Sequence, residues 1–235
     1  MAANPSLAAL SGAAIVFDLD GTLVDTAPDL VGTLNVLLRQ EGLAPLPIEV
    51  ARPLIGHGAR RLLERGFAAA NAPLDGEKQT DLFNRFLAHY FAHIADESRP
   101  FPGCVEALTA IKAAGARLAV CTNKPTNLSI ALLDALGMAP LFDAVIGPDA
   151  APAPKPDPRH LEAAVRAAGG SMDRTIMVGD AATDAGAAKA AGVPLVLVSF
   201  GYTEIPPAEM DPDALIDHFD QLPAACLRLL GACEA

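Results

Sequence analysis

Two carboxylates, Asp18 and Asp20, directly follow an apolar run at residues 13–17. The run predicts a buried strand of a parallel sheet, and ligands bind beyond the carboxyl ends of such strands. Carboxylates this close together repel one another unless a shared proton or a cation relieves the repulsion. A hard divalent ion with oxygen ligands, Mg²⁺, fits such a pair best. The same Asp-Leu-Asp-Gly-Thr stretch also fits a strand followed by an ordinary turn.

Polar residues also follow three further predicted strands, where each strand ends or leads into a loop. They come after the runs 117–121, 144–147 and 175–178 and are Thr122, Lys155, Asp180 and Asp184. The carboxyl ends of parallel strands share one edge of the sheet, so the sequence predicts that these residues meet Asp18 and Asp20 in one pocket. A hydroxyl, an ammonium group and paired carboxylates at one edge favour phosphoryl transfer.

Each of these side chains has a natural role in that chemistry. Asp18 would attack phosphorus to give an aspartyl phosphate. Asp20 would protonate the leaving oxygen and then, as a base, activate the water that hydrolyses the intermediate. Thr122, Asn123 and Lys155 would bind the phosphoryl oxygens.

The metal-binding set is predicted to combine both pairs of carboxylates. Asp18, the carbonyl of Asp20 and Asp180 would bind Mg²⁺ directly, bridging the nucleophile and the phosphate. Asp184 is expected to orient the groups around the metal, although a direct ligand role is also open.

Between the first strand and residue 98 the sequence predicts helices only. Apolar residues recur at helical spacing in four pieces, which lie near residues 26–42, 48–55, 59–70 and 77–94. The order of elements therefore predicts an α/β protein with a Rossmann-like, doubly wound parallel sheet. The core domain would comprise residues 1–24 and 98–235, and residues 25–97 would form an inserted, all-helical cap domain.

A glycine-rich turn, Ile55-Gly56-His57-Gly58, leads into one of these cap helices. The first N–H groups of a helix attract anions, and two arginines lie on the opening turn, so the segment is a candidate substrate contact. It fits a helix connection with solvated arginines as well. The candidate substrate residues of the cap and the sheet edge are Arg52, His57, Gly58, Arg60, Arg61 and Lys124.

The stretch at residues 15–26 resembles the first motif of the haloacid dehalogenase superfamily of phosphatases. The resemblance extends over nearly the whole chain and places the four motifs at Asp18 and Asp20, Thr122, Lys155, and Asp180 with Asp184. It implies a Mg²⁺-dependent phosphomonoester hydrolase. The second aspartate, which the dehalogenase branch lacks, favours phosphate esters as substrates. Ala181 stands where a serine is frequent in this superfamily.

The position of the helical insert resembles the branch that contains phosphoglycolate phosphatases, β-phosphoglucomutase and phosphonoacetaldehyde hydrolase. Thr122-Asn123-Lys124-Pro125, the Gly-His-Gly turn and Phe200-Gly201-Tyr202 are most similar to phosphoglycolate phosphatases. The resemblance implies a small phosphorylated metabolite as substrate. Another small phosphoester, such as a sugar phosphate, or a phosphosugar mutase reaction remains an alternative.

Composition limits the partners of the protein. The 235 residues carry a net charge of −11, and nucleic-acid binding is not expected because it requires clustered Lys and Arg. No apolar stretch approaches the ~18 residues of a membrane span, so no membrane partner is expected. The four cysteines show no CxxC pair, which favours reduced thiols in a cytoplasmic protein. A monomer or a homodimer is expected.

Overall fold

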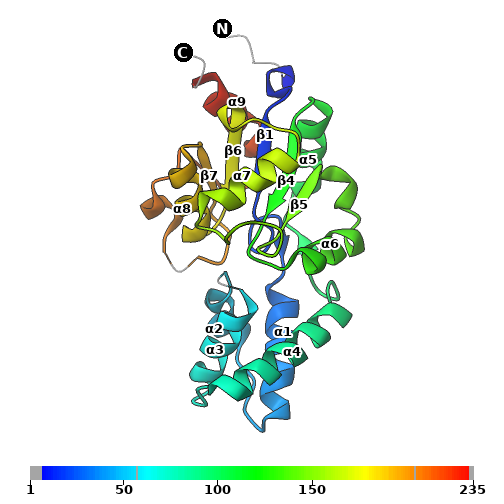
Figure 1. The fold of residues 1–235 in the computed structure, drawn as a ribbon, viewed down its shortest axis with the longest axis vertical. Helices are drawn as coiled ribbons and strands as arrows, with labels where there is room; N and C mark the ends of the chain where they lie inside the picture. The colour runs from blue at the N-terminus through cyan, green and yellow to red at the C-terminus, as the bar shows by residue number, and fades with distance from the viewer. Residues whose placement is uncertain (1–6, 57, 204, 233–235) are drawn as a thin grey trace.

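The computed structural model of the protein describes residues 7–56, 58–203 and 205–232 (Figure 1). Its centre is a six-stranded sheet in the order β5-β4-β1-β6-β7-β8, in which every pair of neighbours is parallel. The strands are β1 (Ala14–Phe17), β4 (Arg117–Cys121), β5 (Ala144–Ile146), β6 (Thr175–Gly179), β7 (Leu195–Val198) and β8 (Ala214–Ile216). The predicted parallel sheet and α/β fold class are confirmed.

Helices cover both faces of this sheet (Figure 1). They are α5 (Cys104–Ala113), α6 (Thr126–Ala135), α7 (Pro158–Ala167), α8 (Ala182–Ala191) and α9 (Leu222–Ala232). Short 3-10 helices lie at Leu7–Leu10, Arg52–Leu54, Ala139–Leu141, Met172–Arg174, Pro207–Met210 and Phe219–Gln221. None of the helices in the described ranges is both long and apolar enough to cross a membrane.

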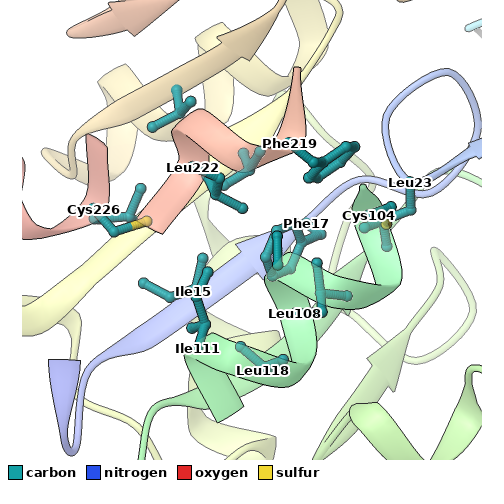
Figure 2. Close-up of a cluster of buried hydrophobic side chains, with 14 of the residues drawn as sticks. Ile15, Phe17, Leu23, Cys104, Leu108, Ile111, Leu118, Phe219, Leu222 and Cys226 are labelled. Atoms are coloured by element: carbon teal, nitrogen blue, oxygen red, sulfur yellow. The ribbon is translucent and has the colours of Figure 1, made fainter. Parts of the chain in front are cut away.

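The central strand β1 is buried on both sides because its side chains alternate between two hydrophobic clusters. Ile15 and Phe17 belong to the cluster that includes residues of α5 and α9, and Figure 2 shows these side chains packed together. Ala14 and Val16 belong to the cluster on the other face, under α7 and α8. A strand covered on both faces is apolar at every position, which explains why the first apolar run ends abruptly at Asp18.

The insert after β1 consists of α1 (Ala27–Gln40), α2 (Ile48–Ala51), α3 (Ala59–Ala69) and α4 (Gly76–Ala92). These helices form their own hydrophobic cluster around Phe67 and Phe86 and lie at one end of the sheet (Figure 1). The helix predicted at residues 48–55 is wrong in its second half, which is the 3-10 helix Arg52–Leu54. Pro53 has no amide hydrogen to donate, and so it cannot continue the α-helical pattern.

Two short strands, β2 (Val24–Asp25) and β3 (Arg99–Pro100), pair antiparallel where the chain enters and leaves the insert. Asp29 stabilises the same connection between the sheet and the insert. Its carboxylate accepts hydrogen bonds from the backbone of Glu97 and from Ser98 N and Oγ at 2.6 to 3.1 Å. The sequence did not predict this paired connection. It ties together the two points where the chain passes between the sheet and the insert.

Candidate active site

The polar residues predicted to converge do lie together at the carboxyl edge of the sheet. Asp18 directly follows β1, and Thr122 and Asp180 directly follow the neighbouring strands β4 and β6. Carboxylate oxygens of Asp18, Asp180 and Asp184 lie within 4.8 Å of one another. Lys155 reaches them from the loop after β5, and its Nζ is 2.9 Å from Asp18 Oδ1. The parallel arrangement of the strands therefore builds one site from four distant segments.

Asp18 is the least satisfied member of this group. Its Oδ1 is buried and accepts no well-aligned hydrogen bond; its one close polar contact is the ion pair with Lys155 at 2.9 Å, while Lys155 donates its hydrogen bond to Asp184 at 2.6 Å. Burial raises the pKa of Asp18 to about 6, although Lys155 opposes the shift. A buried carboxylate oxygen that accepts no hydrogen bond is well placed to bind a cation or to act as a nucleophile.

Asp184, in the first turn of α8, is fully buried and uses both oxygens within the protein. Oδ1 accepts a hydrogen bond from Lys155 Nζ at 2.6 Å, and Oδ2 accepts from the backbone N–H groups of Asp180 and Ala181 at 3.1 and 3.0 Å. A Cβ on Gly179 would lie 2.4 Å from the Asp184 side chain, so the strand end must be glycine. This engagement favours an orienting role for Asp184 over direct metal binding.

Asp180 is held by two residues whose contacts the sequence did not predict. Thr22 Oγ1 donates to its Oδ1 at 3.0 Å, and the backbone N–H of Tyr202 donates to its Oδ2 at 2.7 Å. Burial, together with Asp184 and Asp18, raises the pKa of Asp180 well above its usual range. Gly201 permits the close approach, since a Cβ there would lie 2.2 Å from the Asp180 Cβ.

The loop that carries Lys155 is fixed by two neighbouring side chains. Asn123 donates from Nδ2 to the Lys155 carbonyl and accepts from the Lys155 N–H, both at 3.0 Å. His160 Nδ1 accepts from the same N–H at 3.1 Å, so its Nε2 carries the proton that it shares with the Ile146 carbonyl. Burial lowers the pKa of His160, which keeps this neutral form. The Asn123 side chain thus supports Lys155, and its phosphate contact stays a prediction.

Asp20 contacts a second lysine. Lys124 Nζ donates to Asp20 Oδ1 at 3.0 Å and to the hydroxyl oxygen of Tyr90 at 2.7 Å. Lys124 is buried, and although burial opposes the shift, Asp20 and Tyr90 raise its pKa to about 12. The Thr122 hydroxyl accepts from the Lys124 backbone N–H at 3.2 Å. The ammonium group therefore remains charged inside the site.

A cavity of about 50 Å³ lies between the sheet edge and the insert. Asp18, Asp20, Thr122 and Lys124 line its core side, and the insert contributes Gly58 and several apolar side chains. Lys124 is the only cation among the described residues that line it. The predicted substrate residue His57 lies outside the described residues.

The three predicted cap arginines have other contacts and do not belong to the described cavity lining. Arg52 pairs with Asp25 at 3.1 Å, and Arg60 lies 4.0 Å from the centre of the Phe83 ring. Arg61 is exposed on α3 and pairs with a glutamate one turn away. Their contact with substrate stays a prediction, and the geometry favours Lys124 instead.

Comparisons with known proteins identify the family of the chain. A family model described as haloacid dehalogenase-like hydrolase matches residues 13–192. The phosphoglycolate phosphatase of Caulobacter vibrioides is 60% identical over 226 residues, which are 96% of this chain and 95% of that protein. The phosphoglycolate phosphatase of Mesorhizobium japonicum is 48% identical over 208 residues, which are 88% of this chain and 92% of that protein.

A solved structure shares the same fold. The crystal structure of a predicted phosphoglycolate phosphatase from Haemophilus somnus matches with a TM-score of 0.81 at 32% identity, and the match covers 88% of this chain and 95% of that one. The chain therefore belongs to the haloacid dehalogenase-like hydrolases, as the motifs predicted. The expected enzyme class, a phosphoric monoester hydrolase, is confirmed by the same relatives.

Proposed function

We propose that this enzyme hydrolyses 2-phosphoglycolate to glycolate and inorganic phosphate through an aspartyl phosphate on Asp18. The observation that carries the chemistry is the buried Oδ1 of Asp18, which accepts no hydrogen bond and lies 2.9 Å from the Lys155 ammonium group. The substrate is supported by the names of relatives up to 60% identical and by a small cavity that holds one cation among its described lining.

The donor set fits a magnesium ion. Mg²⁺ prefers oxygen ligands, and carboxylate oxygens of Asp18, Asp180 and Asp184 lie within 4.8 Å of one another. Asp18 Oδ1 accepts no hydrogen bond, so it is available to a cation. Asp18, Asp180 and the Asp20 carbonyl would hold the ion, with Asp184 orienting the loop. When bound, Mg²⁺ offsets charge on the phosphoryl oxygens and on the nucleophile.

Each side chain of the site has a separate role in the two chemical steps. An Asp18 oxygen forms a bond to phosphorus while the bond from phosphorus to the glycolate oxygen breaks, and Asp20 gives its proton to that oxygen. Asp20 then takes a proton from the water whose oxygen bonds to phosphorus, while the bond from phosphorus to the Asp18 oxygen breaks and inorganic phosphate is released. Thr122 and Lys155 hold the phosphoryl oxygens through both steps, and Asp184 keeps Lys155 in place.

We further propose that residues 25–97 act as a cap that opens and closes at the paired connection of β2 and β3. The cavity lies between this insert and the sheet edge, so closure would exclude water from the aspartyl phosphate. The cytoplasmic location and the monomeric or dimeric state stay predictions.

A phosphate-release screen tests the proposed function. We expect 2-phosphoglycolate to give the highest kcat/KM in a panel of phosphoesters, and a chelator to abolish turnover until Mg²⁺ is added back. A higher kcat/KM for a sugar phosphate would contradict the substrate. Conversion of a phosphosugar to its isomer without net phosphate release would instead support a mutase.

Recognition of the substrate carboxylate gives a sharper test. Because Lys124 is the cation in the described cavity lining, we expect Lys124→Ala to raise KM for 2-phosphoglycolate by about tenfold or more. Arg61→Ala is the matched control, and its KM should stay within about twofold because Arg61 is exposed and pairs outside the cavity. Steady-state kinetics decide, and a larger KM change for Arg61→Ala than for Lys124→Ala would reject this assignment.

A further inference from the structure

Tyr90 is an unusual residue for the place it occupies. It lies near the end of α4, is 1% exposed, and stacks on Phe86 with ring centroids 6.0 Å apart. Its hydroxyl oxygen accepts a hydrogen bond from Lys124 Nζ at 2.7 Å. A phenylalanine would pack as well without burying a hydroxyl, so the polar atom calls for a separate explanation.

The insert offers the cavity almost no other polar side chain. Among the described residues, those of the insert that line the cavity are all apolar or glycine except Tyr90. The Lys124 ammonium group, which Tyr90 contacts, also lies 3.0 Å and 3.3 Å from the two carboxylate oxygens of Asp20. A continuous chain of contacts therefore joins the insert to the proposed acid and base.

We propose that Tyr90 is a positioning residue for proton transfer, whose hydroxyl holds the Lys124 ammonium group against Asp20. Asp20 Oδ1 accepts the shorter hydrogen bond from Lys124, at 3.0 Å, and Oδ2, 3.3 Å from Nζ, would carry the proton that passes to the leaving oxygen as its bond to phosphorus breaks. The acid site would then be complete only while α4 is seated on the core. The inference rests on the proposed function only in taking Asp20 as the proton donor.

The position of Lys124 makes this arrangement depend on Tyr90. The ammonium group lies 4.4 Å from the centre of the Tyr90 ring as well as against its hydroxyl, so the ring and the oxygen both face it. Without the hydroxyl, the charge would keep the ring contact but lose the acceptor that sets its direction. A displaced Lys124 would leave the Asp20 carboxyl group free to rotate, and misplacement of a catalytic group slows the chemical step.

The test uses three small phosphoesters and the variant Tyr90→Phe. 2-Phosphoglycolate has an alkoxide leaving group and a carboxylate, ethyl phosphate has an alkoxide leaving group only, and acetyl phosphate releases acetate, which needs no proton. The value of kcat/KM reports the steps up to departure of the leaving group. We expect it to fall about tenfold for both alkoxide substrates and to stay within about twofold for acetyl phosphate.

Other outcomes would overturn the proposal. An equal loss of kcat/KM on all three substrates would show that the Tyr90 hydroxyl has a structural role. A loss of kcat/KM on 2-phosphoglycolate alone would show that the hydroxyl acts in recognition of the substrate carboxylate. Phe83→Leu, which alters α4 away from the cavity lining, is the control and should not change the ratio of ethyl to acetyl phosphate turnover. Wild-type turnover of 2-phosphoglycolate is measured separately, so failure of the proposed function is distinguishable.

A double-mutant cycle keeps the test informative if Tyr90→Phe is less stable than the wild type. Lys124→Met removes the group on which Tyr90 acts, so the double variant should show the same ethyl to acetyl ratio as Lys124→Met alone. Independent, multiplicative effects on that ratio would show that Tyr90 does not act through Lys124.

Discussion

Asp18→Asn is expected to abolish phosphate release from 2-phosphoglycolate, with kcat lower by roughly 10⁴-fold or more. The substitution keeps the shape of the side chain, but an uncharged amide cannot form the aspartyl phosphate. Acid-quenched wild-type enzyme should carry a phosphate adduct on the peptide that contains residue 18. Mass spectrometry should find no such adduct in the variant.

The same substitution should leave the fold intact. Asp18 is one of three carboxylates within 4.8 Å of one another, and Lys155 keeps its shorter ion pair with Asp184 when Asp18 is replaced, so the variant loses one ion-pair contact at 2.9 Å but also the repulsion among the carboxylates. We expect the denaturation midpoint in the presence of a chelator to stay at the wild-type value or rise. Asp173→Asn, at an exposed position, is the matched control and should keep full activity. Phosphate release by Asp18→Asn near the wild-type rate would reject the nucleophile.

The core of the fold follows from local patterns in the sequence. The run predicted at 117–121 coincides with β4, whose four residues after the exposed Arg117 are apolar and buried, as a strand covered on both faces requires. Once the strands are parallel, their carboxyl ends must share an edge, and the meeting of Asp18, Thr122 and Asp180 follows. The site was therefore predictable wherever the functional residue directly follows a strand.

Contacts between side chains that are distant in the sequence could not be predicted from local sequence patterns. Thr22 reaches Asp180 across 158 positions of sequence, and Tyr90 reaches Lys124 across 34. Spacing along the chain fixes neither pair, because both depend on how the insert and the loops pack on the sheet. His160 belongs to the same group, since its backbone partner is set by the turn that carries Lys155.

The arginines of the insert show a second limit. Their place on the opening turn of α3 predicted contact with an anion, but the rotation of that helix decides which side chains face the cavity. Arg60 lies over Phe83, and the backbone of Gly58 lies at the cavity instead. A local pattern can identify the segment that approaches the substrate without identifying which of its side chains does so.

Lys155→Met is expected to lower the free energy of unfolding by about 3 kcal/mol, because it removes one partner of a buried ion pair. Lys155 is buried, and its Nζ lies 2.6 Å from Asp184 Oδ1 and 2.9 Å from Asp18 Oδ1. Methionine fills a similar volume but leaves these carboxylates without a compensating charge. Activity should fall by roughly 100-fold or more, since the phosphoryl oxygens lose a fixed cation.

Urea unfolding with a chelator present measures the change in stability. Lys189→Met, at an exposed position on α8, is the matched control and should alter the free energy of unfolding by less than about 0.5 kcal/mol. Added Mg²⁺ should recover part of the loss, since a second cation can take over some of the compensation. Asp18→Asn and Lys155→Met are thus expected to change stability in opposite directions while both lose activity. Equal losses of stability would mean that packing, and not the balance of charge, holds the site together.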